Sequence, residues 1–379
     1  MSKSMELYLH IPFCARKCAY CDFLSFSCGT EIQKRYVDQL IEEIKTASAG
    51  FRDTSVTSVF VGGGTPSILR SEEIVRIFDV LRNTFNIEET AEISMEANPG
   101  TVTKEKLLDY RKAGINRLSF GLQSADNGEL KALGRIHTYE EFLESYHMAR
   151  ACGFDNINVD LMSALPGQTV DSWLETLKKV AALEPEHISA YSLIIEEGTP
   201  FYELYGEDRG ENLLPDEDSE REMYHQTKTV LKELGYERYE ISNYAKPGFE
   251  CRHNVGYWTN VPYLGLGLGA SSYIDGCRFQ NTSDLEEYLN GGAGVRHEEL
   301  ALSEQDMQEE YFFVGLRMVR GVSLKQFEEQ FGIPADQVYP GILERLVREG
   351  VVEQVGDMFR LTEYGMDVSN YVMAEFLQG

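Results

Sequence analysis

Residues 7–21 of this 379-residue chain are Leu-Tyr-Leu-His-Ile-Pro-Phe-Cys-Ala-Arg-Lys-Cys-Ala-Tyr-Cys. The apolar run 7–11 is typical of a buried strand, and Cys14, Cys18 and Cys21 follow directly after it. Thiolates at this spacing can hold one face of an iron–sulfur cube, because the irons of such clusters favour cysteine sulfur. Three ligands leave one iron open, and an open iron can chelate a small molecule. We therefore predict a [4Fe–4S] cluster directly after the first strand.

A zinc site is the alternative that these cysteines leave open. Structural zinc usually takes four protein ligands in a closed tetrahedral arrangement. Cys28 is the nearest further cysteine, but it lies seven positions after Cys21, which is a loose spacing for a fourth ligand. The chain has seven cysteines, and this odd number argues against a disulfide framework. No role is assigned to Cys152, Cys251 or Cys277.

The first two hundred residues alternate between short β-branched runs and longer amphipathic stretches. Strands are expected at 7–11, 56–61, 92–96, 117–121, 157–162 and 188–194, with one more at 238–243 extending the sheet. Helical patterns between them include 33–44, 104–112, 139–151 and 172–183. This alternation predicts an α/β fold with parallel strands covered by helices. Six such units correspond to a partial (β/α)6 barrel of the TIM type, whose site residues gather at the carboxyl ends of the strands.

The alternation of strand-like and helical stretches ends after about residue 200. Residues 206–219 are polar and acidic and are expected to form an exposed loop, whereas 244–275 are rich in Gly, Tyr, Asn and Ser and are expected to pack as irregular structure. Helices are then expected at 304–319, 324–331 and 337–348, followed by a hairpin of 351–354 and 358–361 and a last helix. We predict a barrel domain over 1–243, a connecting segment over 244–300 and a winged-helix-like C-terminal domain over 301–379.

Charge and hydropathy narrow the class of protein. The chain has 35 basic and 62 acidic residues, a net charge of −27, which opposes non-specific binding to nucleic acid and to anionic lipid. No stretch approaches the roughly 20 apolar residues that a membrane-spanning helix needs. The N-terminus leads into a strand and not into the apolar region of a signal peptide. We expect a cytoplasmic protein without a membrane anchor.

Ordered motifs across most of the chain resemble the radical S-adenosylmethionine superfamily, and within it the oxygen-independent coproporphyrinogen oxidase group. The cysteine motif with its flanks is the first of them. The others follow in the same order, as Gly62-Gly63-Gly64-Thr65-Pro66-Ser67, Glu96-Ala-Asn98-Pro99, and residues 116–124, 133–137 and 158–169. The resemblance implies a [4Fe–4S] cluster whose open iron chelates S-adenosylmethionine, with one-electron cleavage of that cofactor as the associated chemistry.

The same resemblance implies which residues bind the cofactor. They are Tyr8, Tyr20, Gly63, Gly64, Thr65, Glu96, Gln123, Arg135, Asp160 and Ile194. The glycines and the threonine would hold the methionine part of the cofactor, and the tyrosines and the isoleucine would line the pocket. Its amino-acid and ribose groups would be bound by Glu96, Gln123, Arg135 and Asp160. From the residues alone, the glycines indicate only a tight turn, and an isolated charged residue is more often a solvated loop residue or part of an ion pair.

Two branches of this group differ in function, and residue 23 separates them. In the oxidase branch, which decarboxylates two propionates of coproporphyrinogen III, the motif continues past the third cysteine as Cys-x-Cys. Here the stretch is Cys21-Asp22-Phe23, so the extra thiol is missing. A haem chaperone branch has Cys-x-Phe at this place and a downstream His-Asn-x-x-Tyr-Trp signature. This chain has that signature at His253, Asn254, Tyr257 and Trp258.

The likeness to the haem chaperone branch implies haem binding and delivery to client haemoproteins such as respiratory-chain enzymes. A neutral histidine can ligate haem iron and aromatic rings can pack on a porphyrin. From the residues alone, the alternative is that His253 satisfies a buried hydrogen bond and Trp258 fills the core. Haem propionates are anionic, so local cations such as Arg252 and Arg278 would have to offset the net charge. The sequence leaves open whether S-adenosylmethionine is cleaved, and whether the chain forms a homodimer.

A winged-helix regulator that binds DNA is a third hypothesis. Residues 301–379 hold 6 basic and 14 acidic residues, a net charge of −8. Nucleic-acid binders usually present a basic face, because phosphate neutralisation supplies most of their affinity. We therefore expect no nucleic-acid partner, and we expect the terminal domain to contact protein, cover the barrel or form a dimer.

Overall fold

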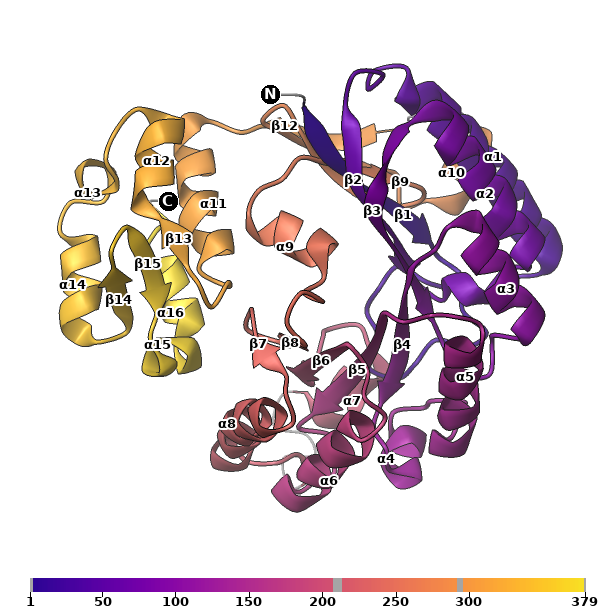
Figure 1. The fold of residues 1–379 in the computed structure, drawn as a ribbon, viewed down its shortest axis with the longest axis horizontal. Coiled ribbons are helices and arrows are strands. Elements are labelled where there is room, and N and C mark those ends of the chain that lie inside the picture. Colours follow the sequence, from indigo (N-terminus) through magenta and orange to yellow (C-terminus); the bar gives the residue numbers. More distant parts are fainter. Residues whose placement is uncertain (1–2, 207–212, 292–295, 378–379) are drawn as a thin grey trace.

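The computed structural model describes residues 3–206, 213–291 and 296–377. Six parallel strands, each paired with the next in the chain, form the centre of one sheet. They are β1 (Ser4–Ile11), β2 (Ser55–Gly63), β3 (Asn86–Ala97), β4 (Arg117–Gln123), β5 (Ile157–Ser163) and β6 (His187–Ser192). Figure 1 shows this sheet as an open arc with helices on its outer side. The predicted partial (β/α)6 barrel is confirmed.

Helices follow the strands in the chain. They are α1 (Thr30–Ser48), α2 (Ser71–Thr84), α3 (Lys104–Ala113), α4 (Asn127–Ala132), α5 (Tyr139–Ala151), α6 (Val170–Ala181), α7 (Pro200–Tyr205) and α8 (Glu217–Glu233). Local chemistry fixes several ends: a capping box of Thr138 and Glu141 begins α5, and Gly114 ends α3 at a φ of 91°. Part of the predicted acidic loop, residues 207–212, lies outside the described residues, and its last residues already belong to α8. No helix among the described residues has both the length and the apolar character needed to span a bilayer.

Residues 237–301 extend the sheet at both edges. The strands are β7 (Glu237–Arg238), β8 (Asn243–Ala245), β9 (Tyr263–Leu266), β10 (Ser271–Ile274), β11 (Cys277–Asn281) and β12 (Arg296–Ala301), with helices α9 (Arg252–Trp258) and α10 (Leu285–Asn290). The single strand predicted at 238–243 is wrong, because two short antiparallel strands flank a turn there. Irregular structure over 244–275 is also wrong, since β9 pairs in parallel with β1. Glycine permits the close packing of β9 against β10: a Cβ on Gly265 would lie 2.2 Å from the carbonyl oxygen of Ser271.

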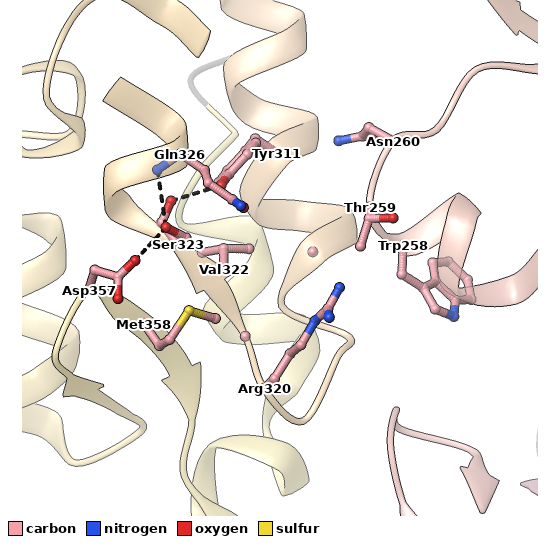
Figure 2. Close-up of a pocket in the computed structure, with 12 residues that line it drawn as sticks. Trp258, Thr259, Asn260, Tyr311, Arg320, Val322, Ser323, Gln326, Asp357 and Met358 are labelled. Carbon is pink, nitrogen blue, oxygen red and sulfur yellow. Dashed lines mark hydrogen bonds between the residues drawn. The ribbon is translucent and has the colours of Figure 1, made fainter. Parts of the chain in front are cut away.

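The C-terminal part is a helical unit with a small sheet of its own. It contains α11 (Glu304–Gly315), β13 (Val322–Ser323), α12 (Leu324–Phe331), α13 (Ala335–Val338), α14 (Ile342–Glu349), β14 (Val352–Val355), β15 (Met358–Leu361), α15 (Glu363–Asp367) and α16 (Ser369–Ala374). Its strands form a sheet of order β13-β15-β14. Along the chain, helices α11, α12 and α14 come before the hairpin of β14 and β15, which is the order of a winged helix. In Figure 1 this unit lies beside the open side of the barrel with α9 between them. A cleft, shown in Figure 2, separates it from the end of α9.

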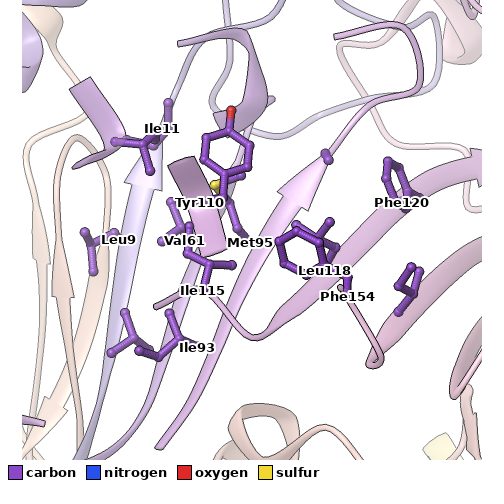
Figure 3. Close-up of a cluster of buried hydrophobic side chains, with 14 of the residues drawn as sticks. Leu9, Ile11, Val61, Ile93, Met95, Tyr110, Ile115, Leu118, Phe120 and Phe154 are labelled. Atoms are coloured by element: carbon purple, nitrogen blue, oxygen red, sulfur yellow. The ribbon is translucent and has the colours of Figure 1, made fainter. Parts of the chain in front are cut away.

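The main core lies between the sheet and its outer helices. Successive side chains of a strand point to opposite faces, and on β1 this places Leu7, Leu9 and Ile11 in the apolar core. Figure 3 shows this layer continuing across the neighbouring strands to Tyr110 of α3. Tyr8, which alternates with them, points to the interior of the barrel and lines a polar cavity there. The apolar core therefore fixes which side chains of each strand are available to a site.

Candidate functional site

One cavity at the carboxyl ends of the central strands brings together most of the residues predicted for the cluster and the cofactor. From that set its lining contains Cys14, Cys18, Tyr20, Cys21, Gly63, Gly64, Thr65, Glu96, Gln123, Arg135 and Asp160. They come from the loop after β1, the ends of β2, β3 and β4, the segment after α4, and β5. Residues more than a hundred positions apart thus share one wall, as the rule for parallel barrels predicts.

Two predicted residues do not line this cavity. Tyr8 lies deeper in the barrel, where its hydroxyl is 3.0 Å from Nδ1 of His10. It sits in the middle of β1 and not at its end, which explains the depth. Ile194 follows β6 on a loop and its side chain is 67% exposed. The backbone has already left the sheet at that point, so its side chain turns to solvent.

The cysteine loop is anchored at both ends by backbone hydrogen bonds. The amide of Cys14 donates to the carbonyl of Phe26 at 3.0 Å, and the amide of Phe26 donates to the carbonyl of Pro12 at 2.9 Å. Phe13 is fully buried between them. Further along, the amide of Ala19 donates to the carbonyl of Leu133 at 3.3 Å. These contacts hold the cysteine loop over the cavity, with all three cysteines on the cavity lining.

None of the three cysteines of the loop forms a disulfide, and all three are half-buried. The guanidinium of Arg135 donates to the sulfur of Cys18 at 3.4 Å. Burial raises the pKa of the Cys21 thiol. Within the described residues no three His, Cys, Asp or Glu side chains converge on a single ion. The ligands of one ion must all lie within about 2.3 Å of it, so this arrangement argues against a mononuclear site such as zinc and leaves a cluster, whose ligands bind different irons, possible.

The glycine run brings the end of β2 against β1 and its loop. A Cβ on Gly64 would lie 2.8 Å from the carbonyl oxygen of Phe13, and one on Gly63 would lie 2.5 Å from the ring of His10. Gly63 also has a φ of 112°, a conformation that strains other residues. Its amide donates to Oε2 of Glu96 at 3.1 Å. The run therefore acts as a tight turn and also places bare backbone on the cavity wall.

Two buried carboxyl groups give the cavity its electrostatic character. Burial, and then the neighbouring Asp160, raises the pKa of Glu96 from 4.5 to about 8. Burial also raises the pKa of Asp160, although Asn158 at 2.8 Å and Ser119 at 3.1 Å donate to it. A positively charged ligand group beside these carboxyls would offset the cost of ionising them. The cavity is thus suited to an amine or a sulfonium.

Two buried polar atoms on the cavity wall have no hydrogen-bond partner within the protein. Oε1 of Gln123 and Nε of Arg135 are buried without a hydrogen-bond partner, and both residues line the cavity. Buried polar groups are normally paired, so each orphaned atom needs an explanation. Three free thiols, bare glycine backbone, paired carboxyls and these two atoms together fit an iron–sulfur cluster with a polar, cationic ligand.

The structure adds lining residues that were not predicted as site residues. They are chiefly Asn98, Ser119, Gly121 and Tyr191. Asn98 connects two predicted residues, because its amide donates to Thr65 at 3.0 Å and its oxygen accepts from Arg135 at 2.7 Å. Strand alternation could have found the two residues of β4, which share a face with Gln123. Nothing in the sequence pattern singled out Tyr191.

His253 lies in a second cavity, which shares walls with the first at Glu96 and Asp160. Its side chain is 1% exposed, with Nδ1 2.8 Å from the Ser58 hydroxyl and Nε2 3.0 Å from the Tyr257 hydroxyl. Burial, and then Arg117, lowers the pKa of His253 to about 3, so the ring is neutral. Both ring nitrogens are therefore occupied by hydrogen bonds within the protein.

The His-Asn-x-x-Tyr-Trp signature is divided between two places. Asn254 and Tyr257 line the inner cavity with His253, but Trp258 lines the cleft toward the C-terminal unit. Cys251, at the start of α9, is fully buried, and its sulfur is 3.4 Å from Oε1 of Glu92. Burial raises the pKa of Cys251 to about 12, so it remains a thiol.

The two arginines named as partners for propionates are engaged elsewhere. Arg252 donates to the carbonyl of Thr90 at 2.9 Å. Arg278 forms an ion pair with Glu310 at 2.8 Å. Neither side chain lines the inner cavity or the cleft. The arginine on the lining of the cleft is Arg320.

Comparison with known proteins gives matches over the whole chain. The model of the radical SAM superfamily matches residues 8–180, and that of the HemN C-terminal domain matches residues 302–368. The Heme chaperone HemW of Bacillus subtilis is 36% identical over 375 residues, which cover 98% of each chain. Heme chaperone HemW of Lactococcus lactis is 34% identical and covers 100% of this chain and 98% of the relative. That of Escherichia coli is 34% identical over 98% of both.

A solved structure also matches across the chain. It is the coproporphyrinogen III oxidase HemN from Escherichia coli, described as a radical SAM enzyme, with a TM-score of 0.86 and 26% sequence identity. The match covers 99% of this chain and 90% of that one. Barrel, added strands and C-terminal unit are therefore all shared with that structure.

Proposed function

Because the chain belongs to the radical S-adenosylmethionine superfamily, in the HemN-like group with relatives named Heme chaperone HemW, we propose that it binds haem and passes it to client haemoproteins. The observation that carries this proposal is the likeness to those relatives over nearly the full length of both chains. Respiratory-chain enzymes are the clients that we expect.

The cluster and cofactor site is proposed for the cavity at the strand ends. Cys14, Cys18 and Cys21 would ligate a [4Fe–4S] cluster, and S-adenosylmethionine would occupy the space beside it. When bound, this pair supplies one-electron reduction at a sulfonium. Arg135 would stabilise the thiolate of Cys18, and its buried Nε would gain a partner.

The remaining cavity residues would orient the cofactor. Glu96 and Asp160 would face its positively charged groups, and the orphaned Oε1 of Gln123 would accept a hydrogen bond from it. The bare backbone of Gly63 and Gly64 would lie along its methionine part. These groups bind and orient the cofactor, and they exclude water from it. The site would serve assembly or regulation of the chaperone.

The alternative function is the decarboxylation of coproporphyrinogen III, which the fold shared with HemN favours. Phe23 argues against it, because this side chain stands at the cavity where the oxidase branch has a further thiol.

One anaerobic experiment separates the two functions. The reconstituted protein is titrated with haem, and the same sample is assayed for coproporphyrinogen III turnover, with Cys18→Ser as the control for cluster dependence. We expect saturable haem binding and no decarboxylated product. Product that depends on S-adenosylmethionine and on Cys18, without haem binding, would mean that the protein is an oxidase.

A further inference from the structure

Two of the three cysteines in the loop are joined by a chain of hydrogen bonds that has Asn98 at its centre. The sulfur of Cys14 lies 3.5 Å from the hydroxyl oxygen of Thr65, and Nδ2 of Asn98 donates to that oxygen at 3.0 Å. On the other side, Oδ1 of Asn98 accepts from Nη2 of Arg135 at 2.7 Å, and Nη1 of Arg135 donates to the sulfur of Cys18 at 3.4 Å. Asn98 thus reaches each sulfur through a single intermediate residue.

The direction of each bond in this chain follows from the chemistry of its members. A guanidinium has donors only, so the oxygen of the Asn98 amide must face Arg135 and its nitrogen must face Thr65. The Thr65 hydroxyl therefore accepts from Asn98. In the part of the chain that the structure describes, this hydroxyl has no other partner, so its one proton is left for the sulfur of Cys14. A sulfur bound to iron carries no proton and can only accept, so Cys14 and Cys18 would each receive one hydrogen bond.

Asn98 also fixes the orientation of the Arg135 guanidinium. Both protons of Nη2 are used, one by Oδ1 of Asn98 and one by the carbonyl of Gly121. Nη1 is thereby directed at Cys18. A Cβ on Gly121 would lie 3.1 Å from Oδ1 of Asn98 and 3.3 Å from Nη2 of Arg135, so the glycine leaves room for this arrangement.

The turn after β3 holds Asn98 in place through its backbone. The amide of Asn98 donates to the hydroxyl of Ser67 at 3.1 Å, and its carbonyl accepts from the hydroxyl of Thr101 at 2.7 Å. Lys106 joins the two neighbours, because its ammonium group donates to the carbonyls of Ser67 at 2.8 Å and Thr101 at 3.1 Å. The Asn98 side chain is therefore held in position before any cluster binds.

Hydrogen bonds to the sulfurs of an iron–sulfur cluster help to set its reduction potential, because they stabilise the reduced state, which carries more negative charge. We propose that Asn98 is a positioning residue that raises the reduction potential of the cluster, by holding one donor on the sulfur of Cys14 and another on that of Cys18. The inference rests on the proposed cluster site and adds a residue that tunes it. The resemblance to the superfamily implied a role for Glu96 in the same motif but none for Asn98.

The reduction potential tests this role, since a purely structural residue would change how much cluster assembles but not the potential of the clusters that form. Reconstituted full-length wild type, Asn98→Leu and Asn127→Leu are reduced stepwise with dithionite and redox mediators, anaerobically and without S-adenosylmethionine. Electron paramagnetic resonance measures the reduced cluster. Asn127 is an exposed asparagine at the start of α4 and is the matched control.

We expect Asn98→Leu to lower the equilibrium constant for one-electron reduction at least tenfold, which makes the potential about 59 mV more negative. The reason is that losing hydrogen bonds to a charged group changes an equilibrium constant by about tenfold or more. Asn127→Leu is expected to stay within twofold of wild type. Asn98→Ser, with a shorter side chain that stays polar, should shift the potential in the same direction as Asn98→Leu.

A double-mutant cycle tests whether Asn98 acts through Thr65. Thr65→Val removes the hydroxyl and should lower the potential by itself, and Asn98→Leu should then have a smaller effect than in wild type. Potentials of Asn98→Leu and Asn98→Ser within twofold of wild type would overturn the inference, as would fully additive effects in the cycle. Loss of the cluster in both Asn98 variants would overturn it too, because Asn98 would then be a structural residue. A wild-type protein that assembles no [4Fe–4S] cluster would instead refute the proposed cluster site.

Discussion

The raised pKa of Glu96 makes the stability of the protein depend on pH in a way that one substitution removes. In Glu96→Gln the side chain keeps its shape and can still accept the hydrogen bond from the amide of Gly63. The wild-type carboxyl is neutral below its folded pKa of about 8 and is ionised in the unfolded chain above about 4.5. Below pH 4.5 the wild type and the variant therefore have the same free energy of unfolding. As the pH rises from 4.5 toward 8, the wild type becomes less stable than the variant.

The size of this effect follows from linkage. Each pH unit between the two pKa values costs the wild type about 1.4 kcal/mol, so the upper limit is about 5 kcal/mol at pH 8. The carboxyl faces a cavity that water can enter, which raises the effective dielectric constant and reduces the cost. We expect Glu96→Gln to be more stable than wild type by about 1–2 kcal/mol at pH 8 and equal to it near pH 5.

Denaturation by urea, followed by circular dichroism at pH values from 5 to 9 without S-adenosylmethionine, measures this difference. Glu88→Gln is the matched control, because Glu88 lies exposed on the same strand. Its difference from wild type should not vary with pH. Parallel stability curves for Glu96→Gln and wild type over the whole range would refute the burial that we assign to this carboxyl.

Three further predictions concern the cluster loop and the C-terminal unit. Cys18→Ser should abolish the visible absorption of the reconstituted cluster, while Cys28→Ser should retain it; equal loss in both would favour a four-cysteine site. Gly64→Ala should lower cluster occupancy in an iron and sulfide assay, because its Cβ would meet the backbone of Phe13; normal occupancy would contradict this close contact. Phe312→Ala, in the buried aromatic cluster of α11, should cost about 3–5 kcal/mol in denaturant unfolding. Phe313→Ala at a side chain 41% exposed should cost about 1 kcal/mol or less, and similar losses would contradict the packing.

The central strands could be predicted because their signals are local. A buried parallel strand is a short apolar run, and an amphipathic helix has its own period, so each of β1 to β6 is visible in a few residues. The strands β9 to β12 are not. β9 gains its place by pairing with β1, more than 250 residues earlier, and its four residues are too few to show a clear alternation. Pairing over such a distance leaves no mark in a short window of sequence.

The candidate site also has a part that could be predicted from the sequence and a part that could not. Cysteine spacing predicted Cys14, because that signal is local. Glu96 and Asp160 were predicted only from the resemblance to the superfamily, since a lone carboxyl group at a strand end does not distinguish a site residue from part of an ion pair; the structure places all three on one cavity. The environment of His253 could not be predicted, since its partner Ser58 lies 195 positions earlier. The separation of Trp258 from His253 also depends on how α9 sits between the barrel and the C-terminal unit, which no motif encodes.

Haem transfer tests the central claim most directly. The haem-loaded protein is mixed anaerobically with the apo form of a b-type respiratory haemoprotein, and the spectrum of the acceptor is followed over time. We predict that the acceptor gains haem as this protein loses it, with no decarboxylated porphyrinogen formed in a parallel assay. A protein that binds no haem, or that holds haem without passing it on while converting coproporphyrinogen III, would contradict the account.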